Sequence, residues 1–384
     1  MINSNKINPY VSNLSITSIW SIGSFFVNLM PIYFLQNNVY AELIVCTTTI
    51  FLLNQVITLG LSDSILKYGN SALLISLLLI LLNSLFANFF IDYKVVLGSL
   101  GLSSMITIRN YLIKNNIEHK IIKITFFIVL IRIIGSYLIL KYNFTIESYI
   151  ILLFLIPGLL ISLSGLFVSS LNQNSFEIII KKEVLFFAIT TLLSRFLYSL
   201  SSRISIFVLN NQECFDEIKL VGFLFSFIGI YSVINQSIRN VLIGKVSSSI
   251  EESKKLFFKV VSSLKIFLLL NFIVSVVLSL IIYNIFDWNS FEVLAIDFSI
   301  IALIFLFFFI FGLLPFFGLF NVALRTLNRI DIEIFINILR LLFIFLITFY
   351  FTGIYFIYVY LIILFLSEII LAIISNKFLF KWKK

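Results

Sequence analysis

The chain has 384 residues, of which 61% are hydrophobic and 12% are charged. Soluble proteins carry about 45–50% apolar and about 25% charged residues, so this chain cannot cover a water-exposed surface, and a soluble enzyme is excluded. Continuous apolar runs such as 300–314 also exclude a β-barrel, whose strands alternate over about 10 residues. The net charge of +9 reflects lysines in short connections, as the positive-inside rule predicts, so we expect no nucleic-acid partner. The sequence therefore predicts an all-α integral membrane protein.

Twelve apolar stretches, separated by polar breaks, are each long enough to cross a bilayer as a helix, which takes about 18 residues or more. Six precede the polar connection at 172–183 and six follow it, as a duplicated six-helix unit would produce. We therefore expect an N-terminal lobe at 1–175 and a C-terminal lobe at 176–384. The predicted spans are 14–35, 39–61, 71–90, 95–113, 121–140, 148–171, 184–209, 218–243, 260–283, 293–320, 332–351 and 354–375.

The basic residues of the short connections set the predicted orientation. If the N-terminus lies in the cytoplasm, the outer connections carry Lys94, Lys141 and Lys219, whereas the inner connections carry the remaining lysines. Such an asymmetry in short loops places the basic side in the cytoplasm. Both termini are therefore expected on the cytoplasmic side.

Signatures of catalysis and of metal or cofactor binding are missing from the sequence. Cys46 and Cys214 fall in segments at different depths, and the single histidine, His119, has no ligand partner at helical spacing. Neither a glycine-rich phosphate loop nor a Ser/His pair is present. We therefore expect no catalytic residue, no metal and no cofactor, and a protein that is not an enzyme.

Arginines inside the predicted spans are the most informative residues. Arg132 lies near the middle of the fifth span, and Arg195 and Arg203 lie in the seventh. A central arginine costs about 2.5–3.5 kcal/mol on insertion scales, so such residues normally face a bundle interior or a watery cavity. In the seventh span Arg195, Ser199 and Ser202 follow helical spacing, with Arg203 beside Ser202. We expect the three arginines to share a cavity and bind an anionic substrate, because guanidinium groups suit phosphate oxygens.

Three other arginines lie closer to the inner boundary, where structural roles compete with substrate binding. Arg340, Arg239 and Arg109 are expected either to extend to the membrane surface or to pair with a carboxylate, although Arg239 is also a candidate substrate-binding residue. The spans offer Glu368 and Asp297 as partners, so the cavity should be positive and in need of a mobile anion. Glu368 is a candidate ion-coupling site, as intramembrane carboxylates generally are, and equally a candidate partner for an arginine.

Amide side chains inside the spans have two interpretations. Asn54-Gln55 in the second span and Asn235-Gln236 in the eighth fall at corresponding places in the two halves. They are candidate contacts for sugar hydroxyls, although intramembrane amides more often fasten one helix to another. The same two interpretations apply to Asn28, Asn240, Asn321 and Asn337.

Four short runs carry a resemblance to a known family. They are GLSDSILKY at 60–68, RISIFVL at 203–209, VGF at 221–223 and FNVALR at 320–325. With twelve spans in two sixes, the chain resembles the O-antigen and capsular repeat-unit flippases (Wzx type) of the multidrug/oligosaccharidyl-lipid/polysaccharide exporter superfamily over nearly its whole length. A proline that commonly follows the eighth span in relatives is missing from GKVS at 244–247, which leaves the subfamily open.

The resemblance implies a two-lobed bundle around a central cavity that alternates between the two sides of a bacterial inner membrane. The implied substrate is a polyprenyl-pyrophosphate-linked oligosaccharide, moved from the cytoplasmic to the outer leaflet for O-antigen or capsular polysaccharide synthesis. Its anionic head would be held between the lobes by Arg132 on one side and Arg195 and Arg203 on the other. Membrane lipids and other polysaccharide assembly proteins are the implied partners.

Two other functions stay open. An ion-coupled multidrug exporter of the same superfamily shares the helix count, although a site for cationic drugs should be acidic and this one is predicted to be basic. A membrane-embedded glycosyltransferase or polymerase would need carboxylates near an interface for acid–base chemistry or a substantial extramembrane segment. The short outer connections disfavour the enzyme.

Overall fold

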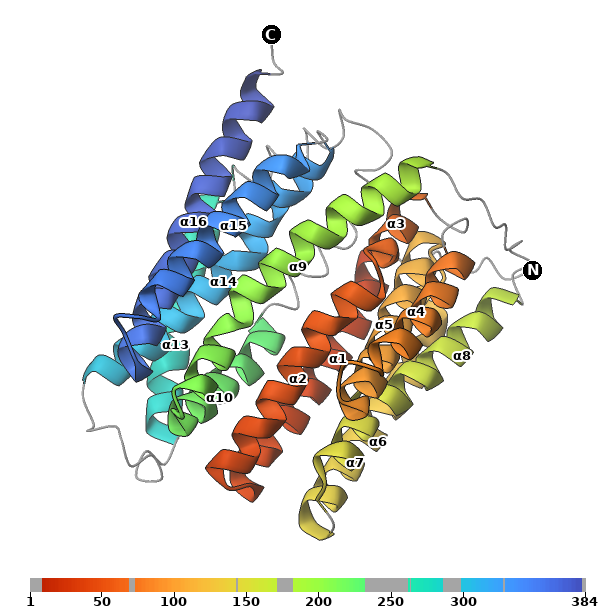
Figure 1. Cartoon of the computed structure of the whole chain (residues 1–384), viewed down its shortest axis with the longest axis horizontal. Coiled ribbons are helices and arrows are strands. Elements are labelled where there is room, and N and C mark those ends of the chain that lie inside the picture. The colour runs from red at the N-terminus through yellow and green to blue at the C-terminus, as the bar shows by residue number, and fades with distance from the viewer. Residues whose placement is uncertain are drawn as a thin grey trace.

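The computed structural model describes residues 9–68, 73–142, 144–170, 182–231, 262, 264–285, 298–326 and 329–381, and across these ranges all regular structure is helical (Figure 1). The N-terminal helices are α1 (Pro9–Phe34), α2 (Asn37–Ile57), α3 (Leu61–Tyr68), α4 (Leu73–Ala87), α5 (Tyr93–Lys114), η2 (Glu118–Ile121), α6 (Ile122–Tyr142), α7 (Ile146–Ile150), the π-helical η3 (Ile151–Leu155) and α8 (Ile156–Ser170). The C-terminal helices are α9 (Lys182–Asn211), α10 (Phe215–Tyr231), α13 (Leu264–Ile285), α14 (Phe298–Thr326), α15 (Ile330–Ile347) and α16 (Gly353–Lys381).

Each of the twelve predicted spans contains helix in the described part of the chain, so the all-α membrane architecture is confirmed. Among the described segments, 7 are long and apolar enough to cross a membrane, and shorter apolar helices cover Leu73–Ala87, Leu268–Asn284 and Ile300–Leu314. In α15 the long apolar run is interrupted by the charged residues Asp331, Glu333 and Arg340. Large apolar side chains such as Phe127 and Leu163 are exposed on the outside of the bundle, where lipid would cover them.

The helix of the second predicted span, 39–61, ends four residues early in the structure. Helix α2 ends at Ile57, a turn covers 58–60, and α3 begins at Leu61. The turn contains Leu59 with φ 46° and Gly60 with φ 71°, which are left-handed conformations that end a right-handed helix. A Cβ atom at Gly60 would lie 2.2 Å from the carbonyl oxygen of Ala188, so the missing side chain lets the turn approach α9 closely.

The sixth predicted span is also irregular, because α7, η3 and α8 follow one another without a connecting loop. The π-helical turn of η3 ends just before Pro157, which lacks a backbone N–H and cannot complete the regular hydrogen-bond ladder. A Cβ atom at Gly158 would lie 2.1 Å from the carbonyl oxygen of Gly101 on α5, so the two helices meet backbone to backbone.

Because no side chain fits at this crossing, we expect Gly158→Leu to lower the unfolding free energy in detergent micelles by about 1–3 kcal/mol or more. The matched control is Leu163→Phe on the same helix, where the side chain is 65% exposed and extra volume meets no neighbour. Thermal unfolding of the two purified variants measures the difference. Equal melting temperatures would contradict the close crossing of α5 and α8.

The N-terminal helices (α1 to α8) and the C-terminal helices (α9 to α16) form two groups. The groups contact each other through α1, α2 and α3 of the first and α9 and α10 of the second. Figure 1 shows α9 running between α2 and α15. Near the start of α2, Tyr40 lies against Gly222 of α10, whereas beyond its other end Gly60 lies against Ala188 of α9. The described helices are therefore joined near both ends of α2. The predicted lobe boundary at 175/176 lies outside the described residues, and the division into two lobes stays a prediction.

Candidate functional site

Arg203 lies where the two groups of helices meet. It is carried by α9, and its guanidinium carbon lies 4.2 Å from the ring centre of Phe51 on α2 and 5.9 Å from that of Phe225 on α10. The aromatic faces attract the cation and hold its plane, as cation–π contacts do. In the described part of the chain, no carboxylate forms an ion pair with Arg203. A cation that is partly buried and held by rings can still accept an anionic partner.

The predicted cationic stripe of α9 is partly buried rather than fully enclosed. Arg195, Ser199 and Ser202 each keep some exposure, as Arg203 does. The fully buried hydroxyl face of α9 is a different one, made of Thr191, Ser194, Ser201 and Ser205, and it packs toward α15 and α16. Sequence spacing identified a polar face on this helix but could not distinguish which of the two neighbouring stripes is buried.

Arg132 lies among the N-terminal helices instead of at the meeting surface. Its side chain is 3% exposed and reaches from α6 to α1, where the guanidinium carbon lies 4.2 Å from the ring centre of Trp20. One terminal nitrogen, Nη1, donates a long hydrogen bond of 3.4 Å to the hydroxyl of Ser24. The contacts of Arg132 and Arg203 are therefore with different helices, and those described do not bring the two arginines into a common site.

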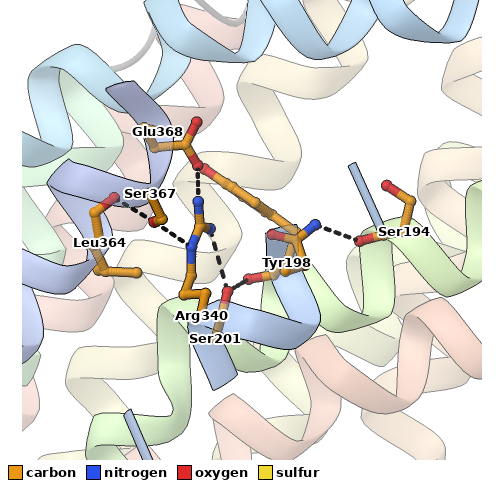
Figure 2. A network of polar contacts seen from close by, with 8 residues as sticks. Ser194, Tyr198, Ser201, Arg340, Leu364, Ser367 and Glu368 are labelled. Carbon is orange, nitrogen blue, oxygen red and sulfur yellow. Dashed lines mark hydrogen bonds and ion pairs between the residues drawn. The ribbon is translucent and has the colours of Figure 1, made fainter. Parts of the chain in front are cut away.

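Arg340 is paired inside the C-terminal helices (Figure 2). Its Nη2 atom lies 2.6 Å from Oε1 of Glu368, and both side chains are 1% exposed. Nε donates to the Ser367 hydroxyl at 2.6 Å, and Nη1 donates to the Ser201 hydroxyl of α9 at 3.4 Å. The network thus connects α15 with α16 and α9. Of the two interpretations for Arg340, pairing is confirmed and extension to the membrane surface is wrong, because the side chain is buried against Glu368.

Arg109 is also paired. Its Nε donates to Oε1 of Glu118 at 2.9 Å, and Asn13 of α1 donates to the other oxygen of the same carboxylate at 3.2 Å. Nη2 of Arg109 donates to the hydroxyl of Thr17. Glu118 was not among the predicted partners, because it lies outside the predicted spans. The signal was present, since Glu118 and Arg109 flank one short connection between two helices.

The described amides mostly fasten helices together. Asn54 is buried and accepts a 2.8 Å hydrogen bond from Ser103 of α5, which joins α2 to α5. Asn337 donates to the backbone of Ser194 at 3.5 Å, joining α15 to α9. Gln55 is partly exposed. A sugar contact for Asn54 and Gln55 stays a prediction, as does an ion-coupling role for Glu368.

Three candidate substrate-binding residues, Asn235, Gln236 and Arg239, lie outside the described residues. Within the described ranges, no group of three His, Cys, Asp or Glu side chains is placed to hold a metal ion.

Comparison with known proteins identifies the fold. Neither a protein-family model nor a curated protein matches the chain. Solved structures match over nearly the whole length, among them an outward-facing multidrug resistance MATE family transporter of the MOP superfamily, with a TM-score of 0.66 and 13% identity over 99% of this chain and 98% of that one. A mutant MATE transporter from Vibrio cholerae gives a TM-score of 0.62 at 13% identity, over 97% of this chain and 94% of that chain.

A third structure is a MOP superfamily transporter from Pyrococcus furiosus, whose binding pocket is said to have reverse polarity. It gives a TM-score of 0.57 at 13% identity, over 98% of this chain and 97% of that chain. At such identities the likeness concerns the fold, so the chain has the fold of MATE transporters of the MOP superfamily. The expected fold is confirmed, whereas membership of the superfamily and of its Wzx-type flippases stays a prediction.

Proposed function

We propose that this protein is an alternating-access transporter that moves a polyprenyl-pyrophosphate-linked oligosaccharide from the cytoplasmic to the outer leaflet of a bacterial inner membrane, for O-antigen or capsular polysaccharide synthesis. The transporter part of the proposal is supported by the full-length likeness to MATE transporters and by the long apolar helices. Both termini lie in the cytoplasm in this proposal, and neighbouring polysaccharide assembly proteins deliver and receive the substrate.

The observation that carries the substrate class is the position of Arg203. It lies on α9 against α2 and α10, between the two groups of helices, where its cationic contacts are aromatic rings. A pyrophosphate head offers charge and paired oxygens to the free edge of such a guanidinium group. The polyprenyl tail can stay in the bilayer while the head passes. With a negative cell interior, each negative charge moved outward gains up to about 2.3 kcal/mol per 100 mV.

Glu368, a buried carboxylate of the described C-terminal helices, favours this proposal over export of cationic drugs. Glu368 is engaged by Arg340 at 2.6 Å, so its charge is already balanced inside the protein. At this position a cationic drug would therefore meet a buried ion pair instead of an available carboxylate. The structural neighbour with a reverse-polarity pocket indicates that this fold also occurs with a binding site of altered charge.

We expect Arg203→Gln to reduce export of the glycan at least tenfold while leaving the protein in the membrane, because removing a central charge makes insertion easier. Arg203→Lys should restore export in part, since an ammonium group keeps the charge without the two-pronged donor geometry. Surface polysaccharide is measured in cells lacking their own flippase, complemented at matched protein level. Full export by Arg203→Gln would contradict recognition of an anionic head and favour the multidrug exporter.

The matched control is Arg329→Gln, which removes a positive charge from a side chain that is 42% exposed and lies at the start of α15. This variant should export normally. Arg195→Gln tests in the same assay whether the predicted partner on α9 also contacts the head.

A further inference from the structure

Arg132 is a buried cation whose donors are not all used. Its side chain is 3% exposed, its Nη1 atom makes a long bond to Ser24, and its plane lies over Trp20. The Nε atom is fully buried and has no hydrogen-bond partner in the described part of the chain. Among the same residues no carboxylate lies within ion-pair distance. A buried charge with an unused donor is costly, and an anion beside it would remove that cost.

A second buried donor lies one helical turn away. Ser136 follows Arg132 by four residues on α6, so the two side chains share one face of the helix. The Ser136 hydroxyl is fully buried and lies within hydrogen-bonding reach of the Tyr149 hydroxyl. Tyr149 donates its own hydrogen to the backbone carbonyl of Val27, so Ser136 is the donor toward Tyr149. An anion beside Arg132 would therefore compete with Tyr149 for the Ser136 hydroxyl and would also meet the unused Nε of Arg132.

We propose that Arg132 and Ser136 form a binding site for a small inorganic monovalent anion, of the chloride type, within the N-terminal helices and apart from the Arg203 site. The donor set consists of one guanidinium group and hydroxyls, which suits a halide. Helices α1 and α6 pack closely beside Arg132, which favours a small anion over a pyrophosphate head. A Cβ atom at Gly23 of α1 would lie 2.3 Å from Val129 of α6, less than one turn from Arg132.

Helix α1 connects this site with the C-terminal helices. Ser24 contacts Arg132, and the next residue, Phe25, packs edge-on against Phe227 of α10 with ring centres 4.9 Å apart. A bound anion would therefore fix the part of α1 that meets α10. The inference concerns a site distinct from that of the transported substrate and does not depend on the identity of that substrate.

Trp20 provides a direct reporter, because its ring lies over Arg132. The chain has 3 tryptophans, and Trp288→Phe with Trp382→Phe leaves Trp20 as the single fluorophore. In detergent micelles at constant ionic strength, bromide replacing gluconate should quench Trp20 with a saturable component, and chloride should displace the bromide and reverse that component. Arg132→Gln should abolish the saturable component and leave collisional quenching alone.

Two further variants make the test decisive. Ser136→Ala should weaken the bromide affinity at least tenfold, and it decides the question if the Arg132 variant does not fold. Arg203→Gln should leave the affinity unchanged, since Arg203 contacts other helices. A tryptophan signal without a saturable component, the same affinity in Ser136→Ala, or loss of the response in Arg203→Gln would each overturn the proposal.

Discussion

We expect Glu368→Gln to lower the unfolding free energy by about 3–5 kcal/mol, because it leaves the guanidinium group of Arg340 buried beside a neutral amide. Unfolding of the purified protein in mixed micelles measures the loss. The double variant Arg340→Met/Glu368→Leu should recover most of the stability, since it removes both charges and fills the space with apolar atoms.

The exposed ion pair of Arg329 and Asp331 is a matched control. Its atoms lie 3.1 Å apart, and the side chains are 42% and 63% exposed, whereas both side chains of the buried pair are 1% exposed. Asp331→Asn should therefore cost at most about 1 kcal/mol. If Glu368→Gln costs no more than Asp331→Asn, the buried pair is not a structural element. If the stable double variant fails to transport, the ion-coupling role predicted for Glu368 gains support.

The second large effect is expected from a bridge between the two groups of helices. Asn37 at the start of α2 donates a hydrogen bond to Asp216 near the start of α10, so cysteines at these positions lie within reach of a short thiol cross-linker. In a background lacking Cys46 and Cys214, the bridged Asn37→Cys/Asp216→Cys protein should lose glycan export at least tenfold. A bridge at this end prevents the separation that alternating access requires.

Reduction of the bridge should restore export, and each single-cysteine variant should export normally before and after treatment with the cross-linker. These controls separate the effect of the bridge from that of losing the Asn37–Asp216 hydrogen bond. Full export by the bridged protein would mean that α2 and α10 stay together at this end throughout transport.

The length and position of the helices could be predicted because apolar runs report directly on burial in lipid. The break at 58–60 could not, since positive φ values at Leu59 and Gly60 depend on how closely α9 approaches. Because the apolar pattern continues through this turn, the sequence does not indicate that the helix ends there. The same limit applies to Pro157, whose place after a π-helical turn depends on the packing of α8 on α5.

The residue types of the candidate site could be predicted from the sequence, but their relative positions could be predicted only in part. The arginines inside the spans were identified from the free-energy cost of inserting a charged side chain into the membrane. The interpretation of Glu368 as an arginine partner is confirmed by its contact with Arg340. That Arg132 and Arg203 contact different helices could not be predicted, because it depends on the rotation of α6 and α9 about their own axes. Hydrophobic periodicity is weak in helices that are apolar nearly all round.

The two sides of α9 differ in how firmly they are attached, which has a mechanical consequence. Toward α15 and α16 it is held by hydrogen bonds from Arg340 to Ser201 and from Asn337 to Ser194. Toward α2 and the turn that follows, Arg203 of α9 contacts the ring of Phe51, and Ala188 of α9 contacts the backbone of Gly60. These contacts include no hydrogen bond between side chains that would have to break when α9 moves along α2. Helix α9 should therefore move together with α15 and α16 as one rigid body. The relative motion of the two groups is then expected between α9 and the helices α2 and α3.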